Sequence, residues 1–345
     1  MEIIEGKEWI PVRRSNLKYY DEVELYYRNP TGRMALYKPS GMPFGDAQLD
    51  SKPYLGQLYI RPQDKIRALR EAQRGFSQSL TSKVQSSDLS SLKQVKSDLS
   101  IIVDETLSEP RSGSLEVMPR YVGTIVEGFS SNPTVIKNLA VMSNADYTTA
   151  IHSINVMALT VGFCYYTGRS LEETQKLGLA ALLHDVGKVE IDPQILIAPR
   201  RLTEDEFQEM SRHPDLGVSI LGEYGAEFEF AISGVMEHHW KLDGSGYPAR
   251  TNGKKISEAG RLIGIIDAYE ALTNDDRPYR SGMSPIGALK LIKKDVDAGL
   301  YDAKLFARFA YSLTDFGSRH LFEAEKSIEL DRPEVEALTD EPSEQ

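Results

Sequence analysis

The stretch Leu182-Leu183-His184-Asp185-Val186-Gly187-Lys188 places an adjacent histidine and aspartate at the end of an apolar segment that begins at Leu177. An ionised aspartate in such a position is costly to bury unless it is paired or holds a metal ion. A buried hydrogen bond between His184 and Asp185 would satisfy the pair. This stretch alone therefore leaves a structural and a metal-binding interpretation open.

The distribution of histidines separates these interpretations. Five of the six histidines fall between positions 152 and 239, with His238 and His239 adjacent, and a second aspartate, Asp267, follows the apolar run 262–266. A buried His–Asp hydrogen bond explains one such pair, but not five histidines and two aspartates in one helical region. Imidazole and carboxylate ligands suit iron, manganese or zinc. Two such ions about 3.5–4 Å apart stabilise the attacking and leaving oxygens of phosphoryl hydrolysis, so the pattern predicts a two-metal site.

Composition and charge exclude several classes of protein. The formal charge of −11 argues against a nucleic-acid binder, and the single cysteine, Cys164, excludes both an internal disulfide and a thiolate metal site. No apolar run approaches the roughly 20 residues of a membrane span. The segment 1–5 contains two glutamates and lacks the basic and then apolar layout of a signal peptide. We therefore expect a cytoplasmic protein with no membrane partner. An anionic substrate would need local positive charge from metal ions and a few placed basic residues.

We interpret residues 1–80 as a small α+β regulatory or packing module. Alternating apolar residues predict one strand at Val23, Leu25 and Tyr27 and its hairpin partner at Met34 and Leu36, with a turn at 29–32 between them. A further strand is predicted at 58–61. It is followed by a helical pattern with Ile66, Leu69 and Phe76 on one side. No catalytic constellation is present in this part of the chain.

Residues 81–129 are predicted to be a helical connector. One narrow apolar stripe suits either core packing, which we favour, or pairing with a second copy in a homodimer: Leu89, Leu92, Val95, Leu99 and Ile102. After a break at 110–113 the pattern is almost entirely helical, with an expected cap at 132–133 and a capping box at 203–206. We therefore predict a mainly α protein with an all-helical catalytic domain at 130–325 and an acidic tail at 326–345.

Several motifs in this order resemble one family. His184-Asp185 is the signature of the HD phosphohydrolase superfamily, and the stretch 238–248, HHWKLDGSGYP, resembles the extended motif of its HD-GYP branch. The similarity covers about residues 130–320 and includes the segments 152–156, 266–273 and 277–280. The resemblance implies hydrolysis of cyclic di-GMP to pGpG and/or GMP. It leaves open another cyclic dinucleotide (3',3'-cGAMP) or a weakly active cyclic di-GMP-binding signalling protein.

Carried over residue by residue, the resemblance implies two divalent metal ions, iron or manganese by preference and zinc as an alternative. The first would be held by His152, His184, Asp185 and Asp267, and the second by Asp185, His213, His238 and His239. Asp185 would bridge the ions, and a water or hydroxide between them would be the nucleophile.

The resemblance also implies residues that contact the substrate. Lys188, one helical turn after Asp185, would bind a phosphate oxygen, so these two residues are the predicted catalytic pair. The segment Gly244–Pro248, with two glycines, a serine and a proline, cannot be helical. In the family this loop, which contains Gly246-Tyr247-Pro248, borders the active site and is implicated in substrate contacts and in contacts with a GGDEF-type protein partner. Arg277 and Arg280 are predicted to bind a second phosphate or a guanine edge through their planar paired donors.

Four positions depart from the family pattern. Trp240 stands where an acidic residue is common, Glu270 replaces an aspartate, and the stretch 273–277 is one residue longer than usual. Thr148 occupies the position of the glutamate that binds a third metal in some members, so we expect two metals. None of these changes removes a ligand of the two-metal site.

Overall fold

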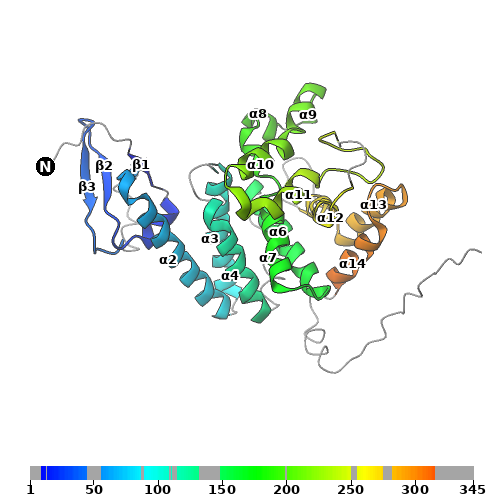
Figure 1. Cartoon of the computed structure of the whole chain (residues 1–345), viewed down its shortest axis with the longest axis horizontal. Coiled ribbons are helices and arrows are strands. Elements are labelled where there is room, and N and C mark those ends of the chain that lie inside the picture. The colour runs from blue at the N-terminus through cyan, green and yellow to red at the C-terminus, as the bar shows by residue number, and fades with distance from the viewer. Residues whose placement is uncertain are drawn as a thin grey trace, which may run out of the picture.

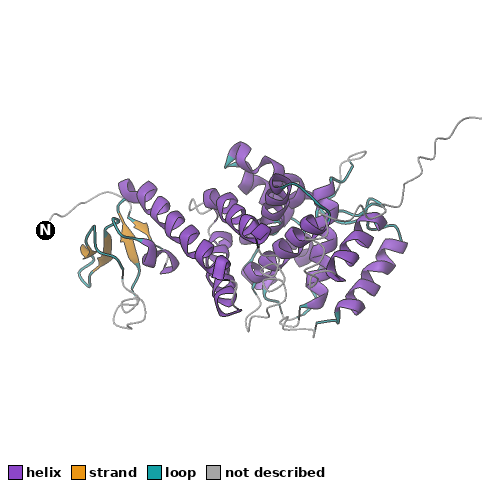
Figure 2. Ribbon diagram, turned by 90° about the horizontal axis from the view of Figure 1, so that it is seen from below, coloured by secondary structure: helices purple, strands orange, loops and turns teal. Residues whose placement is uncertain are grey.

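A small antiparallel sheet at one end of the molecule is joined by a long helix to a helical body (Figures 1 and 2). The computed structural model describes residues 9–12, 14–44, 56–86, 89–108, 110, 115–131, 148–198, 200–249, 255–274 and 282–314. This architecture confirms the predicted class, mainly α with an α+β module at the amino-terminal end. No helix in these ranges combines the length and the apolar character needed to cross a membrane.

The sheet contains strands in the three regions where the sequence predicted them and a fourth, β1, that it did not predict. Its order is β1-β4-β2-β3, all antiparallel, with β1 (Ile10–Pro11), β2 (Leu25–Arg28), β3 (Met34–Lys38) and β4 (Leu58–Ile60). The β2–β3 turn is held by the Asn29 side chain, which accepts hydrogen bonds from the backbone amides of Thr31 and Arg33 at 3.1 and 2.9 Å. Gly32 supplies the positive φ of 79° that this turn requires. A 3₁₀ helix, η1 (Arg14–Tyr19), lies between β1 and β2.

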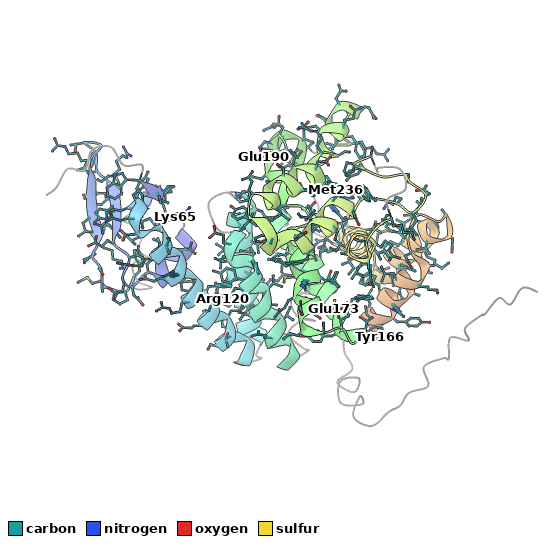
Figure 3. All side chains as sticks on the ribbon, viewed as in Figure 1. Lys65, Arg120, Tyr166, Glu173, Glu190 and Met236 are labelled. Carbon is teal, nitrogen blue, oxygen red and sulfur yellow. The ribbon has the colours of Figure 1, made fainter. Side chains whose placement is uncertain are left out.

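Helix α2 (Lys65–Ser86), preceded by η2 (Pro62–Asp64), belongs to two cores. Ala68 and Ala72 pack with the sheet, whereas Phe76 and Leu80 pack with the helical body. In Figure 3, Lys65 lies near the sheet and Arg120 lies beside the other half of this helix. The predicted boundary at residue 80 therefore falls inside one continuous helix.

Ile66 was predicted to share one helix side with Phe76, but Ile66 is 64% exposed whereas Phe76 is buried. The Leu69 side chain lies outside the described residues. Before Phe76, the buried face of α2 is formed by Ala72 and Ala68, one and two turns earlier. Small residues let the helix approach the sheet closely, and a pattern based on bulky apolar residues overlooks them.

The connector residues form α3 (Leu89–Ser108), η4 (Leu115–Val117) and α4 (Met118–Ser131). Val95, Leu99 and Ile102 of the predicted stripe are buried in the core of the helical body. This confirms the preference for core packing at these three positions. The side chains of Leu89 and Leu92, the predicted cap at 132–133 and the tail at 326–345 lie outside the described residues.

The helical body continues with α6 (Thr149–Tyr166), α7 (Leu171–Leu183), η5 (Val186–Glu190), α8 (Pro193–Leu196), α9 (Glu204–Met210), α10 (His213–Gly222), η6 (Gly225–Phe228), α11 (Glu229–Glu237), α12 (Glu258–Thr273), α13 (Pro285–Asp297) and α14 (Ala303–Thr314). Helix α6 is buried along most of its length, with α7 and α12 packed against it. The predicted capping box at Thr203 and Glu206 is present at the start of α9. Most polar residues of the site lie at or near the ends of these apolar helices, whereas Asp267 lies within α12.

Candidate metal centre

Seven predicted ligand residues converge from five parts of the helical body. His152 lies in α6, His184 and Asp185 follow α7, His213 begins α10, His238 and His239 follow α11, and Asp267 lies in α12. Most are nearly inaccessible: Asp185, for example, is 2% exposed and His184 is 0% exposed. Because polar side chains at this depth need partners, their mutual arrangement decides what the site can bind.

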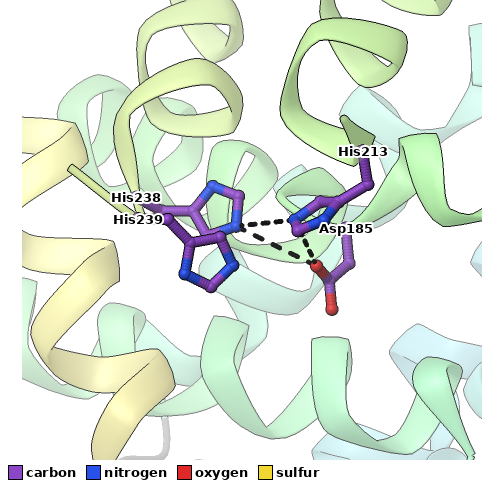
Figure 4. Close-up of side chains that lie close together, drawn as sticks. All are labelled: Asp185, His213, His238 and His239. Atoms are coloured by element: carbon purple, nitrogen blue, oxygen red, sulfur yellow. Dashed lines mark hydrogen bonds and ion pairs between the residues drawn. The ribbon is translucent and has the colours of Figure 1, made fainter. Parts of the chain in front are cut away.

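One group contains Asp185, His213, His238 and His239 (Figure 4). One nitrogen or oxygen atom from each residue lies within 4.8 Å of the corresponding atoms of the others. His213 Nε2 is 3.3 Å from Asp185 Oδ1, and His238 Nε2 is 3.9 Å from the same oxygen. We call this arrangement of four residues the second position.

The other group contains His152, His184, Asp185 and Asp267, and we call it the first position. His152 Nε2 is 3.0 Å from Asp267 Oδ1 and 3.8 Å from Asp185 Oδ2. His184 Nε2 is 3.4 Å from the same Asp185 oxygen. The two carboxylate oxygens of Asp185 therefore face different groups, Oδ2 toward the first position and Oδ1 toward the second.

The backbone fixes the protonation of three histidine rings. His184, His213 and His238 each donate a hydrogen bond from Nδ1 to the carbonyl oxygen three residues earlier, at 2.7, 2.8 and 2.7 Å. Since a carbonyl can only accept, Nδ1 carries the proton, and in a neutral ring Nε2 presents a lone pair. The Nε2 atoms of His213 and His238 are only 3.3 Å apart. Two facing lone pairs are suited to a cation.

Burial keeps the rings of the second position neutral. It lowers the pKa of His213 to about 4 and that of His239 to about 3, and it lowers the pKa of His238 well below its ordinary value of 6.5. Neutral imidazole is the form that binds a metal. In addition, Asp185 Oδ1 is buried and accepts no hydrogen bond from the part of the chain that the structure describes. These donor atoms fit a divalent metal ion.

The first position has a different electrostatic character. Burial alone would lower the pKa of His152, but the carboxylates of Glu270 and Asp267 outweigh it and raise this pKa to about 10. Burial acts to raise the pKa of Asp185 and of Asp267, yet nearby groups, including the Lys188 ammonium for Asp185 and the His152 ring for Asp267, hold both pKa values well below 3.8. Both aspartates are therefore ionised.

Glu270 contacts the first position from behind, a contact that the sequence did not predict. Its Oε2 accepts a hydrogen bond from His152 Nδ1 at 2.5 Å, and its Oε1 accepts from the amides of Asn155 and Asn274 at 2.8 Å each. The only sequence signal is its place three residues after Asp267, which puts both carboxylates on one face of α12.

Lys188 lies where the sequence predicted, beside Asp185, although the segment is the 3₁₀ helix η5. Its Nζ donates a hydrogen bond to Asp185 Oδ2 at 2.5 Å. The ammonium group thus reaches the carboxylate that lies between the two positions.

The Gly246-Tyr247-Pro248 loop is non-helical, as predicted, and borders the second position. The Tyr247 ring stacks on His239 with centroids 4.3 Å apart and an interplanar angle of 30°. Gly246 forms an isolated antiparallel bridge with Trp240. A Cβ atom on Gly246 would lie 2.2 Å from the His239 carbonyl oxygen, and its φ of +92° also favours glycine. Trp240 is 6% exposed, so the residue that replaces the usual acidic side chain is part of the packing beneath this loop.

Two further glycines allow other segments to approach the histidines. A Cβ atom on Gly187 would lie 2.0 Å from the His213 carbonyl oxygen, and one on Gly264 would lie 2.4 Å from the His238 carbonyl oxygen. Any side chain at these positions would push η5 away from α10 or α12 away from α11. Close backbone contact therefore sets the spacing of the histidines.

The remaining predicted residues divide into two cases. Arg277 and Arg280 lie outside the described residues. Thr148 is the N-cap of α6, and its hydroxyl accepts a hydrogen bond from the Ile151 amide at 3.3 Å. The residue at the position of the third-metal glutamate thus caps the helix that carries His152.

Comparison with known proteins adds three findings. Residues 134–305 match the HD domain family. A cyclic di-GMP phosphodiesterase of Pseudomonas aeruginosa is 30% identical over 178 residues, which cover 52% of this chain and 42% of that protein. The 3'3'-cGAMP-specific phosphodiesterase 1 of Vibrio cholerae is 35% identical over 159 residues, which cover 45% of this chain and 36% of that protein. The chain therefore spans less than half the length of these two relatives.

Among solved structures, the fold matches Bd1817, an HDG"Y"P protein from Bdellovibrio bacteriovorus, with a TM-score of 0.60 and 18% identity. The match covers 89% of this chain and 100% of that chain, and it is a likeness of fold. The HD domain match and the similar phosphodiesterases agree with the His184-Asp185 pair and the Gly246-Tyr247-Pro248 loop. Residues 134–305 of the chain therefore match the HD domain family, and the motifs of this region resemble those of its HD-GYP branch.

Proposed function

We propose that this protein is a metal-dependent phosphodiesterase that hydrolyses cyclic di-GMP to pGpG and/or GMP. The observation that carries the proposal is the orientation of Asp185, whose two oxygens face two separate groups of histidines. A carboxylate in this orientation suits two cations held side by side, which is the arrangement used for phosphodiester hydrolysis.

The donor set favours iron or manganese, with zinc as a third candidate, because all the ligand atoms are imidazole nitrogens and carboxylate oxygens. When bound, two such ions would supply Lewis-acid charge and an activated water molecule. Asp185 would hold the bridging place, with His152, His184 and Asp267 on one side and His213, His238 and His239 on the other. The neutral rings of the second group are in the protonation state in which an imidazole binds a metal ion.

Lys188 and the loop at 246–248 are the proposed substrate contacts among the described residues. The Lys188 ammonium group already reaches Asp185, so a phosphate at the bridging place would lie within its range. It would neutralise charge on a phosphate oxygen as the phosphodiester bond breaks. Tyr247, half-buried and stacked on His239, would limit the space on the other side of the site, together with Gly246 and Pro248. Arg277 and Arg280 remain proposed contacts to a second phosphate or a guanine edge.

A second candidate substrate is 3',3'-cGAMP, because one of the similar proteins from Vibrio cholerae is named for that specificity. A third candidate function is a weakly active cyclic di-GMP-binding signalling protein, supported by Trp240 in place of an acidic residue and by the lengthened stretch 273–277. The complete ligand set weighs against the third candidate, since a protein that only binds the nucleotide has no need of every metal ligand.

Parallel turnover assays decide between these candidates. Protein loaded separately with iron, manganese or zinc is incubated with cyclic di-GMP and with 3',3'-cGAMP, and the products are separated chromatographically. We expect pGpG or GMP from wild-type protein and none from Asp185→Ala. Asp215→Ala, at an exposed aspartate in α10, is the matched control and should retain activity. Unchanged cyclic di-GMP with all three metals would contradict the proposal, and faster turnover of 3',3'-cGAMP would reassign the substrate.

The domain division and the protein partners are further proposals. We propose that 130–325 is the catalytic domain, that 1–80 and 81–129 are the regulatory module and connector, and that 326–345 is a tail. A GGDEF-type partner at the 246–248 loop and a homodimer rest on the resemblance and on the connector helix, respectively. Light scattering of the full chain, alone and with a GGDEF domain, tests both associations.

A further inference from the structure

We propose that Glu270 is a positioning residue that orients His152 and makes the first position bind its metal ion more tightly than the second. This inference rests on the proposed two-metal site and assigns a role to a residue that is not itself a ligand. It concerns the order in which the positions fill and the strength with which each holds its ion.

The contacts of Glu270 leave its carboxylate little freedom. The residue is 3% exposed, and both oxygens accept hydrogen bonds, Oε2 from His152 Nδ1 and Oε1 from Asn155 and Asn274. Asn155 lies in α6, one turn after His152, while Asn274 is the C-cap of α12. The carboxylate is thus fixed between two helices, and it in turn fixes the plane of the His152 ring. With Nδ1 committed to Glu270, only Nε2 of His152 faces Asp267 and Asp185.

Four histidines of the site have a known hydrogen-bond partner at Nδ1. Only for His152 is that partner a charged group. His184, His213 and His238 donate to neutral backbone carbonyls, whereas His152 donates to a carboxylate. A carboxylate behind a metal-binding imidazole fixes its tautomer and makes its free nitrogen a stronger donor, and loss of such a partner costs about 10–100-fold in metal affinity.

The first position also has more negative charge around it than the second, which favours binding of a cation there. Its ion would meet Asp185 Oδ2 and Asp267 Oδ1 directly, with the Glu270 carboxylate behind His152. The second position offers one carboxylate oxygen, Asp185 Oδ1, and three imidazoles. The Lys188 ammonium group on Asp185 Oδ2 offsets part of this difference, but the first position also has the carboxylates of Asp267 and Glu270. A divalent cation should therefore bind first, and more tightly, on the side of His152.

Titration of the metal-free full chain with Mn²⁺, monitored by calorimetry, tests this inference. We expect two phases in the wild type, one tighter than the other. In Glu270→Gln, which keeps the shape of the side chain and removes its charge, the tighter phase should weaken by about 10–100-fold while the weaker phase stays unchanged. Glu71→Gln is the matched control, because Glu71 also accepts several hydrogen bonds but does so from backbone amides at 21–23, in the sheet module.

A second variant separates positioning from general loss of structure. Glu270→Asp keeps the charge but is one methylene shorter, so it should restore part of the affinity that Glu270→Gln loses. Nitrogen-15 spectra of the histidine rings should show a changed tautomer or ring environment at His152 in Glu270→Gln and unchanged rings at His213 and His238. A cooperative thermal transition close to that of the wild type identifies a folded variant.

The outcomes distinguish this inference from the proposed function. Two phases of equal affinity, or a Glu270→Gln titration identical to wild type, would overturn the role of Glu270 and leave the two-metal site intact. Weakening confined to the second phase would also overturn it. Absence of any Mn²⁺ binding by the wild type would instead remove the metal centre on which the proposed function depends.

Discussion

The Nε2 atoms of His213 and His238 face each other at 3.3 Å, and both rings carry their proton on the opposite nitrogen. Neither nitrogen can donate to the other, so the contact is unfavourable in a neutral site without a cation. The fold therefore holds these rings in an arrangement that a metal ion stabilises.

Metal removal should lower the stability of the protein. A ligand that binds only the folded state stabilises it by about 2.7 kcal/mol at a free concentration 100 times its Kd. We expect the midpoint of thermal unfolding to rise when Mn²⁺ is added to chelator-treated protein and to rise further with concentration. The same titration of His213→Gln should give a smaller rise, and an equal rise in both proteins would contradict the role of this histidine.

Substitution of the two aspartates should change the metal count differently. Asp185 faces both positions and Asp267 faces only the first. Elemental analysis should give two metal ions per chain for the wild type, about one for Asp267→Asn and fewer for Asp185→Asn. Equal counts in the two variants would show that Asp185 does not bridge.

Lys188 should affect turnover without changing the number of metal ions that the protein binds. A hydrogen bond to a charged group contributes about 1.5–3 kcal/mol, so Lys188→Met should lower kcat/KM by about 10–100-fold at an unchanged metal count. Lys176→Met, at a lysine in α7 paired with the exposed Glu172, is the control and should leave both quantities unchanged. Loss of metal from Lys188→Met would assign the lysine to the metal site and not to the substrate.

The stability of the metal-free protein should depend on pH on both sides of neutrality. Because the pKa of His213 is lowered to about 4 and that of His239 to about 3, the unfolded chain binds protons below pH 6.5 that the folded protein does not. The free energy of unfolding should therefore fall as the pH decreases from 6.5 toward 4. His152 has the opposite sign: with its pKa raised to about 10, its contribution is present below pH 6.5 and is lost as the pH rises toward 10.

Chemical denaturation of metal-free protein between pH 4 and pH 10 measures this profile. His213→Gln should flatten the acidic limb, and His152→Gln should flatten the alkaline limb. An acidic limb of the same slope in His213→Gln would show that other groups control it.

Gly264 should be intolerant of a side chain. A Cβ atom there would lie 2.4 Å from the His238 carbonyl oxygen, so Gly264→Ala must shift α12 or the end of α11. We expect a loss of about 1–3 kcal/mol of stability and weaker metal binding at the second position. Gly222→Ala is the control, because a Cβ there would have no atom within 4 Å apart from its chain neighbours and the backbone of its own helix, and alanine favours a helix. Equal stability of the two variants would contradict the proposed packing.

The amino-acid types along the chain were enough to predict the metal site, one hairpin and one loop. Histidines and aspartates at the ends of apolar segments predicted a metal site, because no other common chemistry accounts for so many of them in a buried helical region. Alternation and turn residues predicted the hairpin at β2 and β3, and glycine and proline predicted the non-helical loop at 246–248. These features depend on local preference and on residue chemistry, both of which a sequence displays directly.

Only the tertiary structure decided how these parts meet. The two Asp185 oxygens face different groups of histidines, and Glu270 contacts His152 across two helices. Both features depend on distances between segments that lie far apart in the sequence. The same is true of the approach of Gly264 to His238, and of Ala68 and Ala72 to the sheet. Such distances are set by how helices pack, and packing depends on the shapes of all the neighbouring side chains together, which no single stretch of sequence contains.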